Sequence, residues 1–352
     1  MKKISLVVLT AALALSLSAC GNGATSSNNS STPAASGGSA GEASQKEKSD
    51  APIKLKLAHI LNTNDIVHEL LVEYAETINE KSEGRIEITV FPNGELGNNK
   101  ESMESVVRGS DVITFGDFAY VGDYVPDYSV FCGPYLFDDY KDITKLAESD
   151  FGKELEQQAS DAGIKVLCAD FYFGTRHTMS KQPFTTPDEM KNLKVRVPST
   201  KMWQETISAM GGNPTVLDWS EVYTGLSQGV VDAVENPLAA MYAANIQEVA
   251  KHLCLTQHFV ATVGLEMSQK QFDAMPADLQ ELLVTETRSF SKYASEKVAE
   301  NENLFIDKFK EAGVEVHEVD VPSFREATEV VYEKFPEWTP GVYERALEAL
   351  GK

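Results

Sequence analysis

The first clear hydrophobic pattern of the chain begins at residue 53 and repeats at every second position. Leu55 and Leu57 alternate with lysines, which predicts a half-buried strand. The apolar residues that follow recur at helical spacing up to a stop at Gly84; they are Val67, Leu70, Leu71, Tyr74 and Ile78. RIEITVF predicts another strand, NNKESMESVVRG a helix and DVITFG a third strand. This strand–helix alternation predicts a mainly parallel, right-handed α/β sheet.

The same alternation returns in the second half of the chain. Four segments predict strands: GIKVLCADF, LKVRVPS, a short stretch around residues 215–217, and VVDAVENP. TKMWQETISAMG and SEVYTGLSQG, which lie between them, predict helices. We therefore expect a second α/β lobe. Residues 277–312 contain neither Gly nor Pro, and a helix of this length would span about 50 Å, enough to cross from one lobe to the other.

Composition and charge limit the classes of partner. The chain has 352 residues, 42% of them hydrophobic, which is enough for two domains. Its 31 Lys and Arg are outnumbered by 53 Asp and Glu, which gives a net charge of −22. Without a basic stripe the chain has no means of neutralising phosphates, so we expect neither a nucleic-acid partner nor electrostatic docking on anionic lipid.

The N-terminus has the pattern of a lipoprotein signal peptide. Lys2 and Lys3 precede an apolar run, and LSAC ends at Cys20, the expected acylation point. The run is too short and too polar for a spanning helix, which argues against an uncleaved anchor. We expect residues 1–19 to be removed and residues 20–50, rich in Ser, Asn and Gly, to form a flexible tether with a reach of roughly 30 Å. Such a protein would be extracytoplasmic and lipid-anchored, at a Gram-positive surface or in a periplasm.

Catalytic motifs are absent from the folded part of the sequence. HExxH, a P-loop, GxGxxG and an EF-hand loop do not occur there, and the six histidines lack metal-ligand spacing. We therefore expect no enzyme, no metal and no cofactor. Cys132, Cys168 and Cys254 have no CxxC spacing and are expected to be buried apolar residues.

Two arginines on apolar, strand-like segments are the unusual chemistry of the chain. Arg196 alternates with Val195 and Val197, and Arg176 lies in a similar segment. A guanidinium does not lose its charge on burial, so each needs an anion, either a protein carboxylate or a ligand. Composition alone favours the carboxylate and leaves the ligand open.

Several motifs in order resemble one protein family. They are FPNGELG, GTRHTMSKQP, DEMKNLKVRVP, SEVYTGLSQGVVDAVENP and MPADLQELL. Together they resemble the DctP-type extracytoplasmic solute-binding proteins of tripartite ATP-independent periplasmic (TRAP) transporters, over essentially the whole chain after the tether. The resemblance implies a two-lobed, periplasmic-binding-protein-like α/β fold with an interlobe cleft, hinge strands and a long helix crossing both lobes. Lobe I would comprise residues 51–173 and about 262–301, and lobe II about 174–261 and 302–352.

The resemblance also implies a ligand site. Arg196 would anchor a ligand carboxylate, Arg176 would be a second cationic contact, and Asn236 would form a hydrogen bond with the carboxylate or a nearby hydroxyl. Further contacts implied by position are Trp219 as an aromatic wall, Asp117 from the first lobe, and Tyr172 and His59. Trp219 could instead be a half-exposed core residue, Asp117 a turn cap, and Glu235 could face away and pair with a lysine.

The function implied is capture of a small organic acid by a monomer and its delivery to membrane permease subunits. A sugar acid, such as a uronate or aldonate, competes with a C4-dicarboxylate as the ligand. An enzyme acting on acidic sugars and a ligand-sensing ectodomain are the alternatives.

Overall fold

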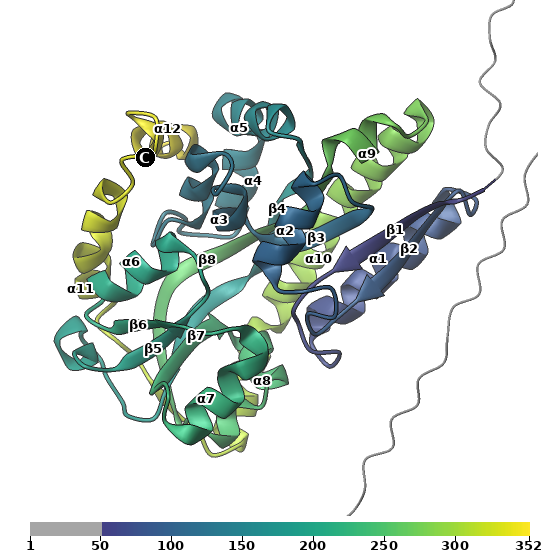
Figure 1. Cartoon of the computed structure of the whole chain (residues 1–352). Coiled ribbons are helices and arrows are strands. Elements are labelled where there is room, and N and C mark those ends of the chain that lie inside the picture. The colour runs from purple at the N-terminus through teal and green to yellow at the C-terminus, as the bar shows by residue number, and fades with distance from the viewer. Residues whose placement is uncertain (1–50) are drawn as a thin grey trace, which may run out of the picture. The chain divides into compact units, whose positions relative to one another are not determined.

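The computed structural model describes residues 51–352 (Figure 1). The predicted signal peptide, Cys20 and the tether to residue 50 lie outside the described residues. The N-terminal part folds as predicted, with the order β1 (Ile53–Ala58), α1 (Ile66–Lys81), β2 (Ile86–Phe91), α2 (Asn99–Val107) and β3 (Val112–Asp117). β1 pairs in parallel with β2 on one side and with β3 on the other.

Two long antiparallel strands join this part to the rest of the sheet. β4 (Ile164–Ser180) and β8 (His252–Ser268) have 17 residues each and pair along their length. β3 pairs antiparallel with the C-terminal end of β8, and β7 (Ala233–Pro237) pairs antiparallel with the C-terminal end of β4. The sheet is therefore mixed: the strand pairs of the N-terminal part are parallel as expected, and the antiparallel pairs at the centre of the sheet were not predicted.

The second half of the sheet is again parallel. β5 (Lys194–Val197) lies between β7 and β6 (Asn213–Val216) and pairs in parallel with both. Over the described residues the sheet has nine strands in the order β2-β1-β3-β8-β4-β7-β5-β6, with β9 (Glu315–His317) paired on β8. β4 and β8 thus link a β2-β1-β3 half with a β7-β5-β6 half. This arrangement fits a two-lobed fold, and the predicted boundaries at 173/174 and 261/262 fall inside these two strands.

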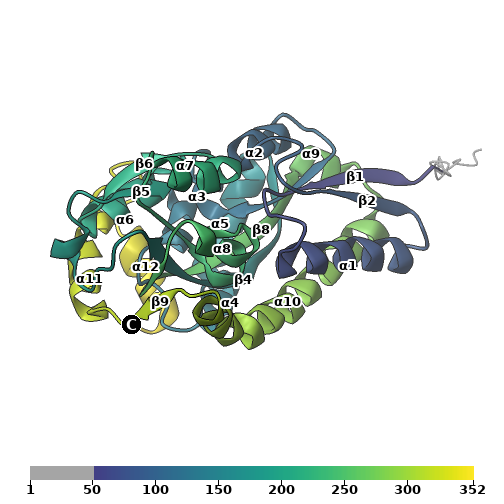
Figure 2. The same ribbon diagram turned by 90° about the horizontal axis from the view of Figure 1, so that it is seen from below.

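A single long helix packs along the linking strands. α10 (Ala277–Glu311) has 35 residues, or about 50 Å, and contacts β4, α1 and α8 (Leu238–Ala243). Figure 2 shows α1 and α10 side by side. Because α1 belongs to the first half and α8 to the second, the helix crosses between the halves, as its sequence indicated.

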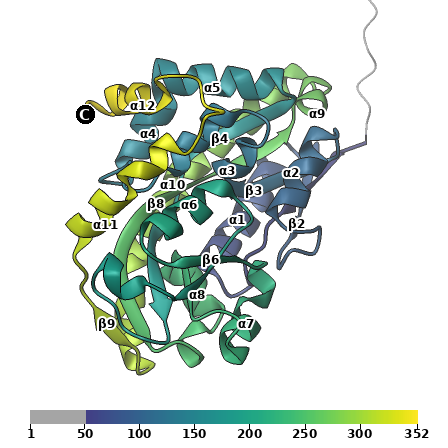
Figure 3. The same cartoon turned by 60° about the vertical axis from the view of Figure 1, so that its left-hand side comes forward.

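Shorter helices cover the remaining faces of the sheet. They are α3 (Phe118–Val121), α4 (Lys141–Glu148), α5 (Asp150–Asp161), α6 (Lys201–Ala209), α7 (Val222–Gln228), α9 (Gln269–Asp273), α11 (Val321–Thr328) and α12 (Val342–Leu350). Figure 3 shows the C-terminal segment, in yellow, passing from α11 beside α6 to α12 beside α4 and α5. α4 and α5 belong to the first predicted lobe, so the packing of α12 does not support placing all of residues 302–352 in the second. Within the described range no helix is both long and apolar enough to cross a membrane.

Capping residues in the sequence explain where α1 and α2 begin. Asp65 caps α1 by accepting a hydrogen bond from the Val67 amide at 2.8 Å. Asn98 and Glu101 form a reciprocal capping box at the start of α2. The three free cysteines at 132, 168 and 254 are buried, as expected.

Candidate ligand-binding site

A cavity of about 270 Å³ lies where the ends of β3, β5 and β7 approach the middle of β4. Five of the predicted site residues line it: Asp117, Arg176, Arg196, Trp219 and Asn236. Asp117 is the last residue of β3, and Asn236 lies at the end of β7. Side chains from both halves of the sheet therefore meet at one place, as ligand sites at the carboxyl ends of α/β strands do.

Arg196 is a buried cation without a carboxylate partner among the described residues. Its side chain is held by a hydrogen bond from Nε to the Leu217 carbonyl at 2.8 Å and by the Trp219 ring, 5.3 Å from the guanidinium carbon. Burial lowers its pKa to about 10, an effect that the nearby charge of Glu235 opposes, so Arg196 stays protonated at neutral pH. Both terminal nitrogens remain available to a ligand.

Arg176 has an internal partner. Its Nε and Nη2 donate to the two carboxylate oxygens of Glu235 at 2.6 and 2.8 Å, and both side chains are buried. The guanidinium carbon also lies 5.2 Å from the Trp203 ring. The expectation that Glu235 faces away to pair with a lysine was wrong, since it pairs with Arg176. The two arginines thus differ: Arg176 is neutralised by a protein carboxylate and Arg196 is not.

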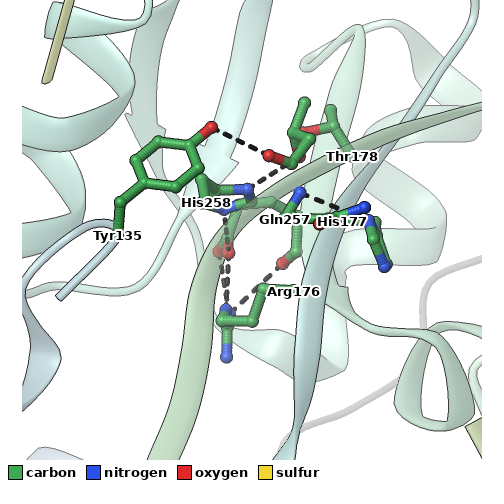
Figure 4. A network of polar contacts seen from close by, with 8 residues as sticks. Tyr135, Arg176, His177, Thr178, Gln257 and His258 are labelled. Carbon is green, nitrogen blue, oxygen red and sulfur yellow. Dashed lines mark hydrogen bonds and ion pairs between the residues drawn. The ribbon is translucent and has the colours of Figure 1, made fainter. Parts of the chain in front are cut away.

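A chain of buried polar contacts runs from Glu235 through His258 and Thr256 to Tyr135 (Figure 4). His258 Nε2 lies 3.2 Å from the Glu235 carboxylate, and His258 Nδ1 lies 2.7 Å from the Thr256 hydroxyl. The Tyr135 hydroxyl donates to the Thr256 carbonyl at 2.8 Å. Burial alone would raise the pKa of Glu235, but the charge of Arg176 and the hydrogen bonds from Arg176 and His258 outweigh it and hold the pKa at about 2. The ion pair is therefore fixed in place beside the cavity.

Asp117 and Asn236 present unpartnered oxygens. The Oδ1 atom of each is buried and has no hydrogen-bond partner among the described residues. Burial raises the pKa of Asp117 to about 6, against the opposing charge of Arg176. A buried polar atom without a partner is costly, so these two oxygens fit the donors of a ligand.

Tyr172 and His59 do not line the cavity. The Tyr172 hydroxyl contacts Thr175 at 2.7 Å and donates to Glu302 of α10, also at 2.7 Å, while the next residue, Phe173, lines the cavity. His59 Nε2 instead lies 3.1 Å from His68. Alternate residues of a strand face opposite sides, and the sequence did not indicate which side of β4 faces the ligand. The predicted ligand contacts of these two residues stay predictions that the geometry does not support.

Other lining residues were missed by the sequence analysis. They include Asn98, Asn99, Glu101, Tyr120, Ser199 and Asp218. Asn98 at the start of α2 donates to Asp218, from the second half of the sheet, at 3.3 Å. The cavity wall therefore already carries a contact between the two halves. The feature of the sequence that could have indicated these residues is the asparagine pair directly after FPNGELG.

Comparison with known proteins agrees with this fold. The profile of DctP, described as bacterial extracellular solute-binding protein, family 7, matches residues 57–337. The 2,3-diketo-L-gulonate-binding periplasmic protein YiaO of Escherichia coli K12 is 31% identical over 292 residues, covering 82% of this chain and 88% of that protein.

Solved structures give the same answer. A TRAP periplasmic solute-binding protein of Fusobacterium nucleatum with bound sn-glycerol-3-phosphate has a TM-score of 0.83 and 34% identity, over 86% of this chain and 97% of that one. Another, of Actinobacillus succinogenes with bound L-galactonate, has a TM-score of 0.82 and 32% identity, over 85% and 99%. These likenesses confirm the predicted periplasmic-binding-protein-like α/β fold. The chain therefore belongs to family 7 of the bacterial extracellular solute-binding proteins and is an extracytoplasmic solute-binding protein of the TRAP type.

Proposed function

We propose that this protein captures a small hydroxylated monocarboxylate, of the sugar-acid class, in the cavity beside Arg196. The observation that carries the proposal is the buried Arg196 guanidinium, whose two terminal nitrogens have neither a hydrogen-bond partner nor a carboxylate partner within residues 51–352. A carboxylate accepts two parallel hydrogen bonds from such a fork. The ligand would thus supply the anion that the protein does not.

The other charges of the cavity argue against a second ligand carboxylate. Arg176 is already paired with Glu235, and Glu101, Asp117 and Asp218 also line the wall. Among residues 51–352, no lysine lines this cavity. A C4-dicarboxylate would therefore bring its second charge near carboxylates, whereas sugar hydroxyls can donate to them and to the Asn236 oxygen. The L-galactonate bound by the Actinobacillus succinogenes protein is a ligand of this kind.

The proposed cycle begins with capture and ends with delivery to TRAP permease subunits. A ligand that touches residues from both halves of the sheet stabilises their closed arrangement, and β4 and β8 are the strands that would bend. The closed form would then dock on the permease. Chemistry on the ligand plays no part in this cycle, so the protein is proposed to act as a monomer without catalysis or cofactor, and without a metal in the ligand cavity.

Calorimetry and thermal-shift measurements on the full chain test the ligand class. L-galactonate and D-glucuronate should stabilise the protein and remain chemically unchanged. Succinate should bind less tightly, and the matched control L-galactono-1,4-lactone, which lacks the carboxylate, should not bind. Tighter binding of succinate or of sn-glycerol-3-phosphate would contradict the monocarboxylate assignment, and product formation would contradict the binding role.

Membrane attachment through Cys20 is proposed on the sequence pattern alone. Cys20→Ala should block acylation and move the chain from the membrane fraction to the soluble or secreted fraction, while ligand affinity stays unchanged. Co-purification of wild-type chain with permease subunits in the presence of ligand would test delivery. Retention of Cys20→Ala in the membrane fraction would contradict the lipid anchor.

A further inference from the structure

Strand β9 brings together three potential metal ligands that are far apart in the sequence. β9 pairs in parallel with the start of β8, with His252 opposite Glu315 and Cys254 opposite His317. Leu253 and Cys254 are fully buried and Val316 packs against the core, whereas the side chains of His252, Glu315 and His317 are 18%, 72% and 22% exposed. His252, Glu315 and His317 therefore share the outer face of this strand pair.

The ligand atoms of these three side chains lie within one coordination sphere. His252 Nδ1 is 3.0 Å from His317 Nε2, and Glu315 Oε2 is 3.7 and 4.0 Å from these two nitrogens. Zinc bonds of about 2.0–2.1 Å in a tetrahedron set the ligand atoms about 3.3 Å apart. The observed separations bracket this value, so small side-chain rotations would complete the geometry.

We propose that His252, Glu315 and His317 form a binding site for a divalent transition metal of the Zn²⁺ class. Two imidazoles and one carboxylate suit zinc and neighbouring first-row ions, and they leave a further position for water or another ligand. The Glu315 side chain is 72% exposed and the two histidines are half-buried, so an ion can enter from solvent. A hydrogen bond between the two imidazoles would explain why His252 and His317 are close together, but it would not explain why Glu315 lies beside both.

The site would fasten β9 to the sheet. β9 has only three residues and follows the C-terminal end of α10, so a metal shared by β8 and β9 would hold the end of the long helix against the linking strand. None of the three residues lines the ligand cavity. The proposal is therefore independent of the sugar-acid function.

Calorimetric titration with ZnCl₂ tests the site on the full chain, prepared without a histidine tag and dialysed against chelator. We expect a single Zn²⁺ per chain and a higher thermal unfolding temperature with metal. Glu315→Gln and His317→Ala should each weaken binding by about tenfold or more, because each removes a ligand. His68→Ala is the matched control: it breaks the other close histidine pair, His59–His68, and should leave Zn²⁺ affinity unchanged.

The variants also separate metal binding from folding. Glu315 is exposed, so Glu315→Gln should unfold like wild type without metal and bind L-galactonate like wild type. Absence of Zn²⁺ uptake by wild type, or equal affinity in wild type and His317→Ala, would overturn the proposal. Equal losses in His68→Ala and His317→Ala would show scattered surface binding and overturn it as well.

Discussion

Arg176 and Arg196 carry the same guanidinium, and only their neighbours distinguish them. Arg176 is bidentate to Glu235, whereas the only hydrogen bond that Arg196 donates within the described residues goes to the Leu217 carbonyl. The sequence placed both on apolar strands but did not indicate which of them had a protein partner. At the residue scale, the expected function rests on this difference in pairing.

Replacing Arg196 with lysine should weaken sugar-acid binding at least about tenfold, or about 1.4 kcal/mol. A lysine ammonium is a point charge and cannot give two parallel hydrogen bonds to a carboxylate. Calorimetry with L-galactonate measures the change. Arg345→Lys, at an exposed arginine paired with Glu154, is the matched control and should bind normally. Unchanged affinity in Arg196→Lys would remove Arg196 from the site.

Ligand affinity should rise as the pH falls from about 7 to 5. Burial raises the pKa of Asp117 to about 6, so this carboxylate gains a proton over that range and stops repelling an anionic ligand. The sign follows from linkage: an anion bound nearby raises the Asp117 pKa further, so binding takes up protons. Calorimetry at several pH values measures the trend. In Asp117→Asn the slope should largely vanish, and an unchanged slope would contradict this assignment.

Strand β4 decides which side chains reach the cavity. Its pairing with β8 shifts register at several points, including between Tyr172 and Gly174 and between Arg176 and Thr178. Each irregularity changes the face that later residues present. Gly174 has a φ of +125°, and a Cβ there would lie 2.8 Å from the Cβ of Pro237 on β7. At the element scale, this glycine permits the close packing of β4 against the strand that carries Glu235 and Asn236.

Gly174→Ala should lower the free energy of unfolding by about 2 kcal/mol or more, through backbone strain and the clash with Pro237. Urea unfolding followed by circular dichroism measures the change. Gly163→Ala is the control, because Gly163 also has a positive φ, +87°, but has no heavy atom within 4 Å of an added Cβ. It should cost about 1 kcal/mol. Equal losses in the two variants would show that packing against β7 contributes nothing.

At the scale of the whole molecule, the acidic surface and the cavity are separate electrostatic systems. The net charge of −22 would repel a free anion at long range, but physiological salt screens charges beyond about 8 Å. Inside, several buried groups are held in one ionisation state. Burial first, and a neighbouring histidine second, lower the pKa values of His59 and His177 to about 3.

The stability that neutral His59 and His177 contribute should fall as the pH drops from about 6.5 to 3. His59 and His177 stay neutral in the folded chain but gain protons near pH 6.5 when unfolded, so their stabilisation is complete above 6.5 and lost below it. Glu235, with its pKa lowered to about 2, adds a loss between about 4.5 and 2. Asp65 and Asp117, with pKa values raised to about 6, and Glu266, whose pKa burial raises well above its usual range, oppose this trend.

Urea unfolding midpoints between pH 7 and 4 measure this dependence. His177→Gln should flatten the slope, since it removes a titrating group at a buried position. A wild-type slope in His177→Gln would contradict the proposed linkage.

The sequence by itself determined the strand–helix order of the first half, the long helix and the positions of both arginines on apolar strands. These features depend on the periodicity of nearby residues and on the chemistry of single residues, and both can be read from a short stretch of sequence. It also carried enough motifs in order to indicate the family. The sequence predicted five of the residues that line the cavity, but it also predicted Tyr172, which does not line it. A motif does not indicate which face of an irregular strand such as β4 a residue lies on.

Only the tertiary structure decided the partners. The pairing of Arg176 with Glu235 depends on β4 lying beside β7, and the meeting of His252 with Glu315 and His317 depends on β9 lying beside β8. Contacts between residues distant in the chain leave no periodic signal in a single sequence. Because Glu235 pairs with Arg176, and Arg196 has no carboxylate partner within the described residues, Arg196 is the cavity arginine that can bind the anion of a ligand.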